Sequence, residues 1–157
     1  MNPRIPFLAV AASLPLLAFA ADCDGDLRDL VAIHSPGAVP GRVTFAGIGA
    51  GSPSAEASAK FEDDHGFPRR FIADFGTELV VLFSGVRGGR TGQLSLMYTG
   101  APIAVRGVFD RWKEVLVGAG AGCAEESCFL EEEGAMVAAL SSRREGLTWE
   151  VYVTIQR

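Results

Sequence analysis

The sequence predicts a mainly β fold, an antiparallel sandwich or a small barrel or meander, with one or two short helices near the N-terminus. After residue 67, runs rich in Val, Leu, Phe and Ile recur at intervals of roughly 8–15 residues with Gly or Pro between them, which is typical of antiparallel sheets. The last run alternates apolar and polar side chains from Leu147 to Ile155, as in a strand with one buried face. An α+β fold is the alternative.

Residues 1–20 have the layout of a secretory signal peptide. Arg4 supplies a basic start, an apolar run follows from Ile5, and Ala18 and Ala20 are the small residues expected at the −3 and −1 positions before a cut. The apolar run is shorter than the ~20 residues that a membrane-spanning helix needs. We therefore expect cleavage near Ala20 and no transmembrane segment in the processed protein.

Residues 21–157 are then expected to form a single β-rich globular domain in the periplasm or outside the cell. A lipid anchor on Cys23 is not favoured, because Asp22 precedes it where lipoprotein processing normally uses a small neutral residue. The whole chain has a formal net charge of −5 and no long basic stripe, so nucleic acid is not an expected partner.

Two helices and a strand are expected before residue 67. Helical spacing of apolar residues predicts a short helix over 26–34, capped by Asp24 or Asp26. A strand is expected over 42–48. A Ser-Pro pair then favours a loose helix over 52–64, with the Ser as N-cap, and a flexible loop is the alternative there.

All later elements are predicted as strands. They cover residues 70–75, 78–84, 93–99, 103–109, 113–117, 128–132, 136–141 and 147–155. We expect the last two to pair as a hairpin through residues 142–146, in which Gly146 supplies a positive φ for the turn.

Three cysteines in an exported chain favour one disulfide and one remaining thiol. We expect Cys123 to pair with Cys128, because they flank a short loop between two predicted strands. A disulfide that uses Cys23, or no disulfide, is the alternative.

Asp63, Asp64 and His65 form the best local cluster for acid–base or metal chemistry. A histidine titrates near neutrality, and neighbouring carboxylates can orient it or share a metal ion with it. A solvated loop is the competing interpretation, and we assign no metal site. No cofactor is expected either, because the Gly-rich run 47–51 lacks both the last Gly of a dinucleotide fingerprint and the Lys of a phosphate-binding loop.

Two features are candidates for a binding surface. Five glutamates near the expected cysteine hairpin suggest an acidic knob that can contact a basic partner: Glu125, Glu126, Glu131, Glu132 and Glu133. Tyr98 and Tyr152 are expected to point outward and to line a ligand surface if one sheet face is exposed, whereas Trp112 is expected in the core.

These observations favour an exported, non-enzymatic binding protein of the bacterial cell envelope that engages a protein partner or a small apolar ligand. One alternative is a small hydrolase or metal-dependent enzyme centred on Asp63, Asp64 and His65. The other is a structural or assembly subunit that uses an open strand edge.

Overall fold

The computed structural model describes residues 26–157, and its main element is an antiparallel seven-stranded sheet with strand order β4-β5-β6-β10-β9-β8-β7. Its strands are β4 Arg70–Ile72, β5 Glu78–Ser84, β6 Gln93–Gly100, β7 Gly122–Cys123, β8 Ser127–Glu132, β9 Ala135–Glu145 and β10 Thr148–Gln156. The sheet has β4 and β7 at its two edges, so it remains open.

A smaller antiparallel sheet with order β1-β2-β3 and three helices complete the described chain. The small sheet consists of β1 Val31–Ile33, β2 Val43–Phe45 and β3 Ile48–Gly49. The helices are α1 Leu27–Leu30, α2 Ser54–Phe61 and α3 Pro102–Gly118, and a short 3-10 turn, η1, covers Asp74–Gly76. The prediction of a mainly β, antiparallel fold is confirmed. The predicted signal peptide, residues 1–20, lies outside the described residues.

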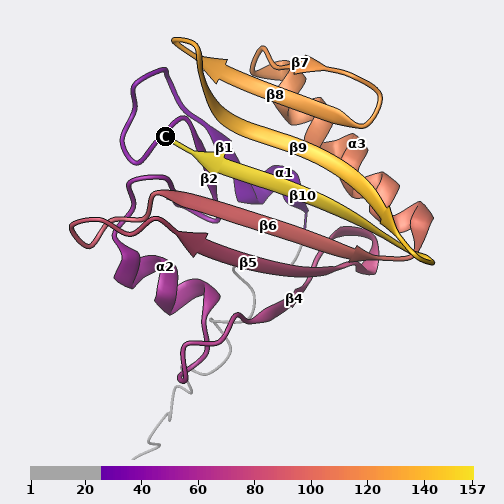
Figure 1. The fold of residues 1–157 in the computed structure, drawn as a ribbon, viewed down its shortest axis with the longest axis horizontal. Coiled ribbons are helices and arrows are strands. Elements are labelled where there is room, and N and C mark those ends of the chain that lie inside the picture. The colour runs from indigo at the N-terminus through magenta and orange to yellow at the C-terminus, as the bar shows by residue number, and fades with distance from the viewer. Residues whose placement is uncertain (1–25) are drawn as a thin grey trace, which may run out of the picture.

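The hydrophobic core lies between one face of the large sheet and α3, which passes behind the sheet in Figure 1 and contacts β6, β8, β9 and β10. The central strands bury alternate side chains, as a two-residue repeat requires. They are Leu79 and Val81 of β5, Leu94, Leu96 and Tyr98 of β6, and Val151, Val153 and Ile155 of β10. The small sheet and α2 add Phe45 and Phe61 to the same core.

The predicted strands at 103–109 and 113–117 are wrong, because both belong to the single helix α3. Its buried residues are Val105, Val108, Phe109, Trp112 and Leu116. This three- and four-residue spacing is an apolar helical stripe, and a proline in the first turn marks where the helix begins. The β-branched valines favoured a strand locally, but packing of the whole stripe against the sheet stabilises a helix.

The N-terminal predictions are partly correct. Asp26 caps α1 by accepting a hydrogen bond from the backbone N–H of Arg28 at 3.0 Å, but this helix ends at Leu30 and the chain continues as β1. The helix α2 exists, yet Ser52 does not cap it. The Ser52 hydroxyl instead accepts a hydrogen bond from the backbone N–H of Gly49 at 2.9 Å.

The predicted hairpin between the last two strands is confirmed, although β9 is longer than expected. It continues to Glu145, which lies opposite Thr148 of β10. The turn is therefore only Gly146 and Leu147, and Gly146 has the expected positive φ of 60°. No helix within residues 26–157 is long and apolar enough to cross a membrane.

Candidate functional site

The three side chains predicted for acid–base or metal chemistry lie in an exposed turn after α2. The Asp63 carboxylate accepts hydrogen bonds from the backbone N–H groups of His65 at 2.9 Å and Phe67 at 3.0 Å, so it stabilises the turn itself. The other imidazole, His34, is hydrogen-bonded to a threonine hydroxyl of β2 at 3.0 Å. Within the described part of the chain, no group of three or more His, Cys, Asp or Glu side chains could hold a metal ion.

The predicted disulfide between Cys123 and Cys128 is confirmed, with an S–S distance of 2.06 Å. The two cysteines lie directly opposite each other in the β7–β8 hairpin. The remaining cysteine, Cys23, is outside the described residues.

The acidic residues form two groups rather than one knob. Glu125 and Glu126 lie in the turn before β8, whereas Glu131, Glu132 and Glu133 lie at its other end. Because a strand rises about 3.3 Å per residue, the length of β8 separates the two groups by roughly 17 Å.

The expectation that Tyr98 points outward is wrong. Tyr98 is only 1% exposed, and its phenol oxygen accepts a hydrogen bond from Nε1 of the equally buried Trp112 at 3.1 Å. Even-numbered residues of β6 face the core, so Tyr98 shares that face with Leu94 and Leu96. The core position expected for Trp112 is confirmed.

Tyr152 lies on the opposite, partly exposed face of the sheet, in a polar cluster with Arg143 and Glu150. Its hydroxyl donates a hydrogen bond to the Glu150 carboxylate. Arg143 donates to the same carboxylate oxygen through Nε at 3.1 Å and to the Tyr152 hydroxyl at 3.1 Å. The guanidinium carbon is also 5.0 Å from the centre of the tyrosine ring, so the three side chains hold one another in place.

The hydrogen bonds of this cluster shift the titration of all three groups. The bond from Tyr152 lowers the pKa of Glu150, and the same bond raises the pKa of Tyr152. The bond to Glu150 raises the pKa of Arg143 above its already high value. The cluster is thus a tyrosine, a carboxylate and a guanidinium that favour their neutral, anionic and cationic forms respectively.

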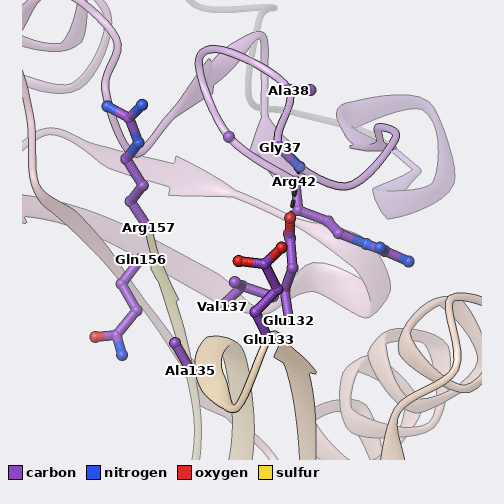
Figure 2. Close-up of a pocket in the computed structure, with 10 residues that line it drawn as sticks. Gly37, Ala38, Arg42, Glu132, Glu133, Ala135, Val137, Gln156 and Arg157 are labelled. Atoms are coloured by element: carbon purple, nitrogen blue, oxygen red, sulfur yellow. Dashed lines mark hydrogen bonds between the residues drawn. The ribbon is translucent and has the colours of Figure 1, made fainter.

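A mixed-charge pocket of about 290 Å³ lies between the loop after β1, the β8–β9 turn and the C-terminus. Figure 2 shows Arg157 and Arg42 on opposite sides of it, with Glu132 and Glu133 between them. Glu132 accepts a hydrogen bond from the backbone N–H of Gly37, which ties the loop to the turn. Because both charge signs line this pocket, it does not favour an ion of either sign.

A second pocket, of about 220 Å³, lies between the first half of α3 and strands β9 and β10, and its walls are mostly apolar. The lining residues are Pro102, Val105, Arg106 and Phe109 of α3, Glu126 before β8, Ser142 of β9, and Trp149 and Val151 of β10. The Arg106 guanidinium contacts Asp110 at 3.2 Å and lies 5.1 Å from the centre of the Phe109 ring.

The hydroxyl oxygen of Ser142 is buried and has no hydrogen-bond partner among the described residues. Ser142 follows Leu140 on the core-facing side of β9 and lies opposite Val151, whose side chain is fully buried. The predicted strands over 103–109 and 113–117 leave no place for this pocket, because one of its walls is the helix that these residues form. The signal that reveals it is the helical spacing of Val105 and Phe109, which places both side chains toward the sheet.

No protein-family model matches the chain, and neither a curated protein nor a solved structure is significantly similar to it.

Proposed function

We propose that the protein is an exported, non-enzymatic binding protein that takes a small apolar ligand into the pocket between α3 and β10. The observation that carries this proposal is the mostly apolar lining of a cavity of about 220 Å³, where Pro102 and Trp149 are accessible and the side chains of Val105, Phe109 and Val151 are buried beneath them. A cavity of about 150 Å³ is enough for one benzene-sized ring. The expected ligand is therefore a single substituted ring or a short branched chain.

Two strongly exposed apolar side chains lie close in sequence to residues of the pocket wall. Ile103 and Leu147 are the most exposed large apolar side chains of the described residues, at 86% and 89%. Ile103 follows the wall residue Pro102, and Leu147 precedes the wall residue Trp149 by two positions. Exposed apolar side chains are common one at a time, so these two are neighbours of the wall residues in sequence and not members of the wall.

Export is supported by the disulfide between Cys123 and Cys128, because disulfides persist in oxidising compartments and are rare in the cytosol. The layout of residues 1–20 favours the same location.

The enzyme alternative has weaker support. His65 is exposed, and the carboxylate of Asp63 is engaged by the backbone of its own turn. Neither residue lines the pockets described above.

NMR of the isotope-labelled protein tests the proposal, with 1,4-dimethylbenzene as the apolar probe. The chain has two tryptophans, so their indole N–H signals are readily assigned. We expect the probe to shift the Trp149 signal, which reports on the pocket wall, far more than the Trp112 signal from the core.

A pocket-filling variant and a matched control complete the test. Val105→Phe places a ring in the cavity and should abolish the shift of Trp149. Val117→Phe makes the same substitution at an exposed site of the same helix and should leave binding unchanged. If the wild-type Trp149 signal does not move, or if Val105→Phe binds as well as the wild type, the proposal is wrong.

A further inference from the structure

We infer that the pocket selects a compact, uncharged ligand that carries one hydroxyl group, and that Ser142 is the residue that determines this specificity. This inference rests on the proposed function and adds the chemical class of the ligand.

Ser142 is the one polar side chain on the core-facing side of β9 that reaches the pocket. The residues before it on this side, Ala138 and Leu140, are apolar and buried. The backbone N–H of Ser142 donates to the carbonyl of Glu126 at 3.1 Å, which holds β9 in place beside the pocket. A serine at this position therefore introduces a hydroxyl into a wall that the strand pattern would otherwise make apolar.

The Ser142 hydroxyl is buried without a partner among the described residues, and the pocket lies beside it. An unpaired buried hydroxyl is unfavourable because it has lost its hydrogen bonds to water. A serine hydroxyl both donates and accepts hydrogen bonds, and a ligand hydroxyl is the small group that complements both properties. A bound ligand of this class satisfies Ser142 while its apolar part contacts Pro102 and Trp149.

Charge in the pocket favours a neutral ligand. The two charged residues that line it, Arg106 and Glu126, have opposite signs. Arg106 is already paired with Asp110 at 3.2 Å. A ligand with a net charge would therefore be attracted by one lining residue and repelled by the other.

The test compares 4-methylphenol with 1,4-dimethylbenzene, which replaces the hydroxyl by a methyl group of similar size. Dissociation constants for both probes are measured from the Trp149 indole signal in the wild type, Ser142→Ala and Ser141→Ala. Ser141→Ala is the matched control, because Ser141 is the neighbouring residue on the other, exposed face of β9.

We expect Ser142→Ala to reduce the preference for 4-methylphenol over 1,4-dimethylbenzene about tenfold, the value of one well-placed hydrogen bond. Ser141→Ala should retain the wild-type preference. An unchanged preference in Ser142→Ala overturns the inference while leaving the proposed function intact. Absence of binding by both probes to the wild type overturns the inference and the proposed function together.

Discussion

Trp112 Nε1 donates a hydrogen bond to the phenol oxygen of Tyr98 at 3.1 Å in the core between α3 and β6. Both side chains are almost completely buried. Each carries a polar atom that is costly to bury unpaired, so their mutual hydrogen bond allows two large aromatic side chains to fill the core. The pair is one of the contacts that join α3 to the sheet, beside the packing of the whole apolar stripe of the helix.

Tyr98→Phe should lower the free energy of unfolding by about 1–3 kcal/mol, because it removes the acceptor for a buried indole N–H. Urea denaturation followed by circular dichroism measures the change. Tyr152→Phe is the comparison, because Tyr152 lies in a more exposed cluster. This variant should lose less free energy of unfolding than Tyr98→Phe. Equal losses in the two variants would contradict the role assigned to the buried pair.

The cluster of Arg143, Glu150 and Tyr152 should give the protein two pH-dependent contributions to stability. The pKa of Glu150 is lowered in the folded state, so its contribution is present above the pKa of an unfolded glutamate and is lost as pH falls through the lowered value. The pKa of Tyr152 is raised, so its contribution is present below the pKa of an unfolded tyrosine and is lost as pH rises through the raised value.

Two substitutions should move the titration of Tyr152 in opposite directions. Glu150→Gln removes the carboxylate that favours the protonated phenol, so the pKa of Tyr152 should fall. Arg143→Gln removes a positive charge that favours the phenolate, so the same pKa should rise. Titration of the tyrosine signals by NMR measures both shifts. Shifts of the same sign in both variants would show that the cluster does not form in solution.

The disulfide should stabilise the fold modestly. Cys123 and Cys128 are five positions apart, and closing so short a loop removes little entropy from the unfolded chain. The double variant Cys123→Ala/Cys128→Ala should therefore lose about 2 kcal/mol and remain folded. Thermal unfolding of the double variant measures the loss in free energy of unfolding, and thermal unfolding of the reduced wild type is a second measurement of the same loss. A variant that fails to fold would mean that the hairpin depends on this bond.

Processing of the N-terminus is tested by the intact mass of the protein recovered from the cell envelope. We expect a mass that corresponds to a chain beginning at Ala21, and one alkylatable thiol, Cys23, without reductant. Ala20→Asp should block processing, because the cut requires a small residue at this position. A full-length mass in the wild type, or added lipid at Cys23, would contradict the predicted export route.

Much of the large sheet was predictable because its strands carry a local signal. Residues 147–155 alternate apolar and polar side chains, and burial of Val151, Val153 and Ile155 follows that alternation. The turn glycine Gly146 and the pair Cys123–Cys128 were predictable for the same reason, since each depends on residues close in the sequence.

The sequence by itself therefore determined the strands over 78–84, 93–99 and 147–155. It also determined the last hairpin and the disulfide. Only the tertiary structure decided that residues 102–118 form one helix, because the free energy of that helix comes from packing its apolar stripe on a sheet assembled from distant strands. That helix also decided the candidate site. Trp112 of this helix binds the buried phenol of Tyr98, and a pocket forms where the first half of α3, up to Phe109, meets Ser142 and Trp149, more than 30 positions further along the sequence.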